Sequence, residues 1–419
     1  MAQDVVHETA EPRRPLRAAA GRTTRATEMI AAIGGNFACS RARPGPGEQS
    51  PVSNPPTAAD PPIRGMCHIF LAFDVATSVD LTIAAGLLSN QATRPNVSAR
   101  FRAPEFIAYE PAPLRVTQAC GAINVGAWGV QPSVDITVFD FGAASVEYHI
   151  PLDGPLSGLA TLSDLLATHA GIREDARARL ATLVQTITPA LQRPSLSEAI
   201  EDYAVFALDP ASVTGDPDAA LLAHAPTIAR IFRGGDSLSD QEVKDATGAR
   251  LSFTRRDAAV VDWSAAVVID ADPADVLTIL EFANIELLEM RLLDDRLDRT
   301  LAVFYETFSR RHWWRRILSG GSRDLRRLAA MQTDAALMFE GVNNAIKLVG
   351  DQYLARLYRA ASARMGVPEW QTSVRRKLAT LESIHSKVAD HGAAFRMEAL
   401  EWTIVILILF EVVMSLVRG

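Results

Sequence analysis

Apolar and polar side chains alternate most clearly in the segment Asp135-Ile-Thr-Val-Phe-Asp-Phe-Gly-Ala-Ala-Ser-Val-Glu-Tyr-His-Ile150. From Val146 onward every second residue is apolar, and the residues between them, Glu147 and His149, are polar. This is the period of a strand that is buried on one face. Gly142 lies among small neighbours and supplies a turn. The segment therefore predicts a β-hairpin.

The sequence around this hairpin predicts further strands and several helices. Strands are expected at 67–73 and 202–208, helices at 157–190 and 218–232, and a second hairpin at 250–269 with its turn at Arg255-Arg256-Asp257. Strand hairpins that alternate with helices are typical of α+β domains. We therefore expect residues 67–272 to form one mixed α+β domain.

From Asp272-Pro273 onward the pattern is that of long helices, with Asp as the cap and Pro in the first turn. Apolar residues from Leu280 to Phe308 recur in steps of three or four, as in a coiled-coil seam. The other face of this helix is charged, with Glu281, Glu289, Arg291, Asp294, Asp295, Arg296, Asp298 and Arg299. Glycines near 320 and 366 divide the region. Residues 273–399 are therefore expected to form an antiparallel, coiled-coil-like helical hairpin.

The chain ends in the apolar run Leu400-Glu-Trp-Thr-Ile-Val-Ile-Leu-Ile-Leu-Phe-Glu-Val-Val-Met-Ser-Leu-Val417. Its length and composition predict a transmembrane helix over 400–417, and a buried core helix is the alternative. Basic residues are more frequent before the run than after it, which predicts that the bulk of the chain lies in the cytoplasm or the mitochondrial matrix.

One face of this run carries two glutamates and a serine in steps of three and four. The residues of this seam are Glu401, Ile404, Ile408, Glu411 and Ser415. A polar stripe of this kind usually faces another helix, so it predicts packing against a second copy of the chain. Alternatively, Glu411 lies near the far membrane interface and extends towards water.

Composition excludes some classes of protein. The net charge of −7 argues against a protein that coats nucleic acid over its whole surface. Three cysteines without a CxxC pair fit a reducing compartment without a disulfide framework. Residues 1–65 are rich in Pro, Gly and Arg, and we expect them to be disordered, or to precede the true start at Met66.

The sequence shows no catalytic constellation, and we expect no catalytic, cofactor-binding or metal-binding residues. Asp140-Phe141-Gly142 spells the magnesium-binding tripeptide of kinases, but no lysine precedes Lys244, so a turn is the better interpretation. The histidines at 385 and 391 are six residues apart and lie on opposite helix faces. Cys67-His68 lacks a second pair of ligands. We therefore expect a protein without enzymatic activity and without a cofactor.

A basic-aromatic cluster precedes Gly320. It consists of Arg310, Arg311, Trp313, Trp314, Arg315 and Arg316. Arginine and tryptophan together bind anionic membrane surfaces, and they also bind structured RNA by contacting phosphates and bases. The third alternative is a solvated helix end with one buried Trp. The sequence therefore leaves three alternatives for this cluster: contact with lipid, contact with RNA or the ribosome, or exposure to solvent.

Several of these segments resemble one protein family. They are the Leu-Glu-Trp followed by aliphatic residues and Glu at 400–413, the helical segments 351–358, 370–378 and 381–385, and the hairpin 136–148. Together they resemble the "required for meiotic nuclear division" family, domain of unknown function 155. Ala143, Ala144 and Ser145 are small where that family has aliphatic residues. The resemblance covers 67–419. It implies a membrane-anchored protein at the bacterial or mitochondrial inner membrane, since eukaryotic members support mitochondrial translation.

We therefore expect a membrane-anchored scaffold or tether that forms homo-oligomers and supports translation machinery, and no small-molecule substrate is identified. The alternative is a ligand-sensing or enzymatic α+β domain that signals through the helical region. A deep polar pocket lined by clustered titratable side chains in 67–272 would favour that alternative.

Overall fold

The structure is a computed structural model that describes residues 60–88, 92–93, 111–235, 237–309, 336, 339 and 352–418. The chain divides into residues 1–56 and 57–419, and the described residues all belong to the second unit. Of the segment 1–65, which was expected to be disordered, residues 1–59 lie outside the described residues. The basic-aromatic cluster at 310–316 also lies outside them.

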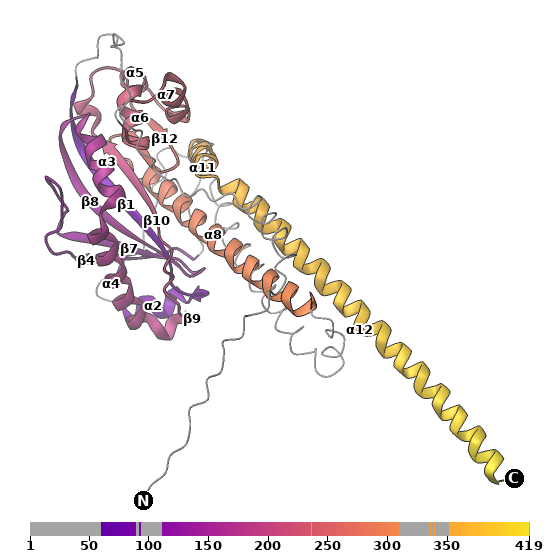
Figure 1. Ribbon diagram of the computed structural model, residues 1–419. Helices are drawn as coiled ribbons and strands as arrows, with labels where there is room; N and C mark the ends of the chain where they lie inside the picture. Colours follow the sequence, from indigo (N-terminus) through magenta and orange to yellow (C-terminus); the bar gives the residue numbers. More distant parts are fainter. Residues whose placement is uncertain are drawn as a thin grey trace, which may run out of the picture. The chain divides into compact units, whose positions relative to one another are not determined.

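In the part of the chain that the structure describes, nine strands form one sheet in the order β11-β12-β13-β10-β1-β8-β7-β4-β3 (Figure 1). Their bounds are β1 Pro62–Asp74, β3 Ala92–Thr93, β4 Leu114–Ala119, β7 Ser133–Val138, β8 Ala143–Pro155, β10 Glu201–Leu208, β11 Arg250–Leu251, β12 Ala258–Val261 and β13 Ala265–Ile269. Neighbouring strands are antiparallel except β10 and β13, which are parallel. Two small ribbons pair β2 (Ser78–Val79) with β9 (Leu191–Gln192), and β5 (Asn124–Val125) with β6 (Trp128–Gly129).

One face of the sheet is covered by short helices. The helices between β2 and β12 are α2 Leu81–Leu87, α3 Gly158–Thr168, α4 Ala170–Ile187, α5 Pro217–Ala223, α6 Ala225–Arg233 and α7 Asp240–Ala246, with 3-10 turns at Thr188–Ala190 and Pro210–Ser212. Side chains from α3, α4 and α6 form one hydrophobic core with residues of the sheet such as Val146 and Tyr148.

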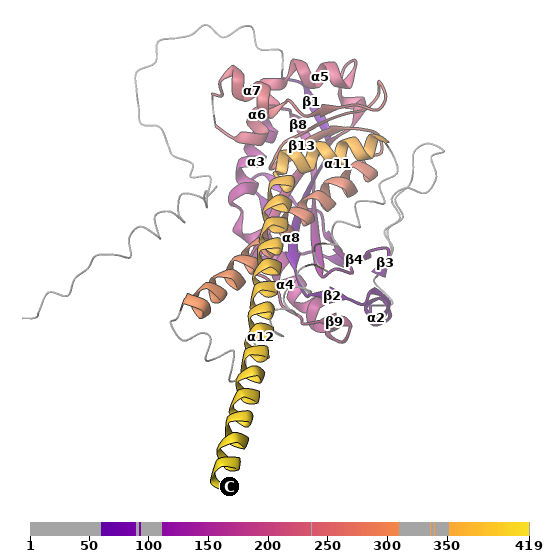
Figure 2. The ribbon, with the colours of Figure 1, turned by 90° about the vertical axis from the view of Figure 1, so that its right-hand side faces the viewer.

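The opposite face is covered by the long helices α8 (Ala274–Ser309), α11 (Gln352–Met365) and α12 (Val367–Arg418). Figure 2 looks onto this face, where α8 packs against β1, β10 and β8, and α11 and α12 pack against α8. Residues 279–286 of α8 are all buried. The protein is therefore a mixed α+β fold in which α8 is a middle layer, and α11 with part of α12 is the outer one.

The first predicted hairpin is confirmed. β7 and β8 pair in antiparallel register, with Val138 opposite Ala144, and Gly142 in the connecting turn has a φ of +97°. The strand at 202–208 and the helices at 157–190 and 218–232 are also present, although His169 and His224 each divide the helical segment in two.

The second predicted hairpin is only partly right. The segment 250–269 reverses twice, because β11 pairs with β12 and β12 then pairs with β13. Asp262 lies at the second reversal, where Arg233 and Arg364 make ion pairs with its buried carboxylate at 2.6 and 2.7 Å. These ion pairs connect α6 and α11 to the edge of the sheet.

The charged face of the first long helix is only partly exposed. Glu281, Glu289 and Asp294 are all buried. The reason is that the sheet covers one side of α8 while α11 and α12 cover the other. Asp294, for example, accepts a hydrogen bond from Ser373 and lies 2.8 Å from Lys377 Nζ, and both partners belong to α12. The buried charged residues therefore lie between layers, whereas Arg291, Asp295, Asp298 and Arg299 are exposed.

The predicted transmembrane helix at 400–417 is also wrong. This segment continues α12, and its residues 400–413 are exposed. Within the residues described, no helix has the length and apolar character needed to cross a membrane. Glu401 and Glu411 interrupt the run, and the apolar residues between them extend only about 14 Å along a helix, whereas a bilayer core is about 30 Å thick.

Stability is expected to depend on pH through Glu289 of α8. Burial raises its pKa to about 8, and the nearby Asp74 adds to this effect while Arg296 opposes it. A pKa raised by folding means that the folded state loses stability as pH rises from about 4.5 to 8. We expect Glu289→Gln, which is neutral throughout, to raise the melting temperature by at least about 2 °C at pH 8.5 and much less at pH 5.

Thermal denaturation followed by circular dichroism at the two pH values measures this effect. Glu174→Gln, at an exposed position of α4, is the matched control and should change neither melting temperature. Equal stabilisation by Glu289→Gln at pH 5 and pH 8.5 would contradict the assignment.

Candidate metal centre

A row of polar side chains crosses four neighbouring strands on the sheet face that α8 partly covers. The register of the strands creates this row: His68 of β1 lies opposite His149 of β8, and Glu147 of β8 lies opposite Asp135 of β7. Asp135 in turn lies opposite Thr117 of β4. Because side chains alternate between the faces of a sheet, all five point to the same side.

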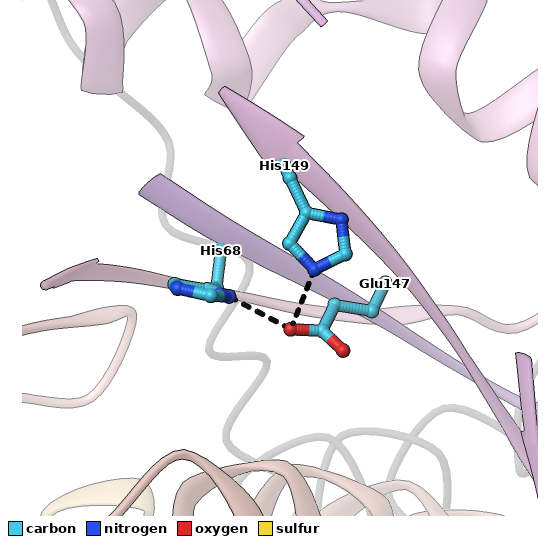
Figure 3. Close-up of side chains that lie close together, drawn as sticks. All are labelled: His68, Glu147 and His149. Carbon is cyan, nitrogen blue, oxygen red and sulfur yellow. Dashed lines mark hydrogen bonds and ion pairs between the residues drawn. The ribbon is translucent and has the colours of Figure 1, made fainter. Parts of the chain in front are cut away.

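Three of these side chains converge on one point (Figure 3). The Nδ1 atom of His68 lies 2.8 Å from Oε1 of Glu147, and Nε2 of His149 lies 3.2 Å from the same oxygen. The two imidazole rings are 5.2 Å apart between centroids and meet edge to face. Two imidazole nitrogen atoms and one carboxylate oxygen therefore face a common space.

The second oxygen of Glu147 is held by a network on β4 and β7. Nη2 of Arg115 donates to Oε2 of Glu147 at 2.9 Å and to Oδ2 of Asp135 at 2.7 Å. Thr117 Oγ1 donates to the other oxygen of Asp135 at 2.5 Å. This network fixes the orientation of Glu147, so that its Oε1 atom remains directed at the two histidines.

The electrostatics keep Glu147 ionised. Burial alone would raise its pKa, but the hydrogen bonds from His149 and His68 hold the pKa well below the usual range of a carboxyl group. Burial lowers the pKa of His149, but the hydrogen bond to Glu147 and its negative charge outweigh burial and raise it. Glu147 is thus a negatively charged group beside two potential nitrogen ligands.

The arrangement has the composition of a metal centre. The ligand atoms of His68, Glu147 and His149 all lie within 4.8 Å of one another. Ligands placed tetrahedrally around Zn²⁺ at its usual bond lengths are about 3.3 Å apart, so small movements would suffice to coordinate an ion. Two histidines and one carboxylate occur in catalytic zinc sites and in non-haem iron sites.

One family model matches the segment that contains this cluster. Residues 64–275, about half of the chain, match the model described as "Uncharacterized protein MJ0711, N-terminal domain". The chain belongs to this family.

The uncharacterized protein MJ0711 of Methanocaldococcus jannaschii is 23% identical to the chain over 235 residues, which are 54% of this chain and 70% of that protein. No solved structure has significant similarity to the chain. The matched segment of the MJ0711 family domain includes β1 from residue 64 onward and all of β4, β7 and β8, and so the whole cluster around Glu147. It ends at the first residues of α8.

The sequence analysis predicted no metal ligands and missed this cluster. The sequence holds one signal for it, because the spacing of Glu147 and His149 places both on one face of a strand. His68 could not be added from sequence alone, since it is 79 positions from Glu147 and its strand could have paired elsewhere. Cys67, its neighbour, is buried in the core on the opposite face.

The other candidate residues lie apart from the cluster. Asp140-Phe141-Gly142 is the turn between β7 and β8, as predicted. Glu401, Ile404, Ile408 and Glu411 of the seam are exposed on α12, and the side chain of Ser415 lies outside the described residues. The same holds for Arg310, Arg311, Trp313, Trp314, Arg315 and Arg316, and for the side chains of both α12 histidines.

Proposed function

We propose that this protein binds one divalent transition-metal ion, such as Zn²⁺, through His68, Glu147 and His149. One observation carries the proposal: three ligand atoms from two neighbouring strands, one of them an oxygen of the Glu147 carboxylate, lie within 4.8 Å of one another. Imidazole and carboxylate together suit Zn²⁺ and other first-row metals. Arg115 and Asp135 would act as the outer partners that orient a ligand carboxylate.

This proposal favours a ligand-binding role for the α+β domain over a purely structural one. The clustered titratable side chains that would support such a role are present on β1, β8 and β7. His68 Nδ1 and His149 Nε2 would bind the ion as neutral nitrogen atoms, and Glu147 Oε1 would supply negative charge. The metal would replace the protons that now link these three groups.

A metal titration tests the proposal. The full chain is stripped with a chelator, and Zn²⁺ is added in competition with a chromophoric chelator of known affinity. We expect one Zn²⁺ per chain, bound more tightly than about 1 µM. Failure to compete at any ratio of protein to chelator would overturn the proposal.

A second proposal concerns assembly, and one surface feature favours it. The helix α12 exposes apolar side chains over 400–413, each 50–63% accessible: Leu400, Trp402, Ile404, Val405, Ile406, Leu407, Ile408, Leu409, Phe410, Val412 and Val413. A continuous apolar surface of this kind marks a protein interaction site. The spacing of Glu401, Ile404, Ile408 and Glu411 is that of a helix seam, so we propose that a second copy of the chain covers it. Such an assembly would fit the scaffold for translation machinery that the resemblance to the meiotic nuclear division family implies.

Disulfide trapping tests this assembly. In a Cys39→Ser background, Ile408→Cys is expected to form a dimer on mild oxidation, because two copies of this seam would lie side by side. Arg376→Cys, at an exposed position of the same helix before the apolar segment, is the control and should remain monomeric. Equal yields of dimer from the two variants, or none from either, would contradict the seam.

A further inference from the structure

An open depression lies beside the turn between β11 and β12, on elements that take no part in the metal cluster. Its volume is about 300 Å³. Its walls come from the turn itself at 253–257, from residues of the segment 210–217 after β10, and from residues 270–271 after β13. Sites for small molecules begin at about this volume and combine an apolar lining with a few polar groups. The depression therefore has the size of a small-ligand site.

The apolar part of the lining contains an aromatic ring. Phe253 is 48% exposed, and the ring of Tyr353 on α11 packs against it with the ring centroids 5.4 Å apart. Pro210 and Pro217 also line the depression, and their rings restrict the backbone on the facing wall. Aromatic rings attract other flat apolar groups through stacked or edge-to-face contacts. This lining therefore favours a ligand with an aromatic body.

Two adjacent arginines supply the basic part of the lining. Arg255 and Arg256 are both exposed, and both line the depression. Their side chains make no hydrogen bond or ion pair with any residue that the structure describes. A guanidinium group binds a carboxylate through two parallel hydrogen bonds. The two side chains are therefore available to an anionic group of a ligand.

The turn that carries the arginines is held in place by Asp257. The Asp257 carboxylate accepts hydrogen bonds from the backbone N–H groups of Phe253 and Thr254, at 2.7 and 2.9 Å, and from the Thr254 hydroxyl group. The backbone N–H group of Arg256 in turn donates to Thr254 Oγ1 at 3.0 Å. A turn fixed in this way has little backbone freedom left to lose when a ligand binds, which favours affinity.

The charges of the lining restrict the ligand further. Asp257 and Asp270 also line the depression, so their negative charges balance those of Arg255 and Arg256. A polyphosphate would bring several negative charges close to these carboxylates, and like charges placed side by side are costly. Both carboxylates already accept backbone hydrogen bonds, Asp257 within its turn and Asp270 from the N–H group of Asp272 at 3.1 Å. The balance therefore favours a ligand with a single carboxylate.

We propose that this depression binds a small aromatic monocarboxylate. The carboxylate binds Arg255 or Arg256, and the ring of the ligand packs against Phe253. The site uses none of the residues around Glu147, so this inference is independent of the proposed metal binding and of the proposed assembly through α12.

Isothermal titration calorimetry of the full chain with naphthalene-2-carboxylate tests the proposal. We expect one binding site with a Kd of about 1 mM or tighter, which is reasonable for a ligand of this size. Replacing both arginines in Arg255→Gln/Arg256→Gln is expected to weaken binding about tenfold or more, because the charged hydrogen bonds are lost. Both positions are exposed, so the variant should fold as the unaltered chain does.

Three comparisons separate this site from unspecific binding. Arg376→Gln removes an equal charge from an exposed position of α12 outside the depression and should leave the Kd unchanged. The uncharged naphthalene-2-carboxamide should bind about tenfold more weakly than the carboxylate, because it lacks the charge that the arginines bind. Inorganic phosphate, which has no apolar body, should fail to displace the carboxylate at equal concentration.

The proposal would be overturned by any of four results. These are no detectable binding of the carboxylate, an unchanged Kd in the double arginine variant, equal affinities for the carboxylate and the carboxamide, and displacement by phosphate. The first would show that the depression holds no such ligand. The second and third would place the bound molecule away from the arginines, on an apolar surface such as that of α12. The fourth would show an anion site without selection for an aromatic ring.

Discussion

The Glu147→Ala variant is expected to lose at least a hundredfold in affinity for Zn²⁺. Glu147 is the centre of the cluster, because both histidine nitrogens approach its Oε1 atom. The two histidines also hold the pKa of Glu147 well below its usual range, and Arg115 donates to its second oxygen. Without it, two imidazoles remain beside Arg115, which keeps only Asp135 as a partner, and the positive charge of that arginine opposes a cation. The measurement is competition with a chromophoric chelator.

A matched control lies on the same strand. Asp153 of β8 is six residues beyond Glu147, and its side chain is 79% exposed. Asp153→Ala removes an identical charge from the same strand and should bind Zn²⁺ as the unaltered chain does. Glu147→Gln preserves the shape of the side chain and should lose most of the affinity as well. Retention of affinity in both Glu147 variants would show that the metal binds elsewhere.

The Gly142→Ala variant is expected to lose about 3 kcal/mol or more of stability. Gly142 has a φ of +97°, a conformation that residues with a side chain rarely adopt. A Cβ atom there would lie 1.9 Å from the carbonyl oxygen of Ala76, which is backbone and cannot move aside. The Gly142 carbonyl also accepts a hydrogen bond from Val75 just after β1, at 2.9 Å.

Gly154 near the end of β8 provides the comparison. A Cβ atom at Gly154 meets nothing within 4 Å, so Gly154→Ala should change stability by less than about 1 kcal/mol. Both variants are measured by urea denaturation of the full chain. Similar midpoints for Gly142→Ala and the unaltered chain would mean that the turn between β7 and β8 can adopt another conformation. Because this turn sets the register of Glu147 against Asp135, loss of structure there should also weaken metal binding.

The hairpin that carries Glu147 could be predicted because its signals are local. Alternating side chains define β8, and Gly142 marks the turn within a few residues of both strands. The layer arrangement could not be predicted in the same way. The apolar stripe of α8 predicts one buried face, and nothing in its pattern shows that a second layer covers Glu281 and Glu289 from the other side.

The metal cluster depends on a contact between distant parts of the chain. Glu147 and His149 come from β8, but His68 is placed beside them by the pairing of β1 with β8, which no local pattern specifies. Conversely, the apolar run of α12 gave a strong local signal that proved misleading. Its two glutamates, Glu401 and Glu411, leave too short an apolar segment for the transmembrane helix that was predicted.

X-ray absorption at the zinc edge of the zinc-loaded chain tests the central claim most directly. The account predicts a first shell of nitrogen and oxygen atoms only, with the outer-shell scattering of two imidazole rings from His68 and His149. The same measurement on Glu147→Ala should show loss of this shell at equal zinc. A sulfur ligand, which would place the ion at a cysteine, or a first shell without imidazole would contradict it.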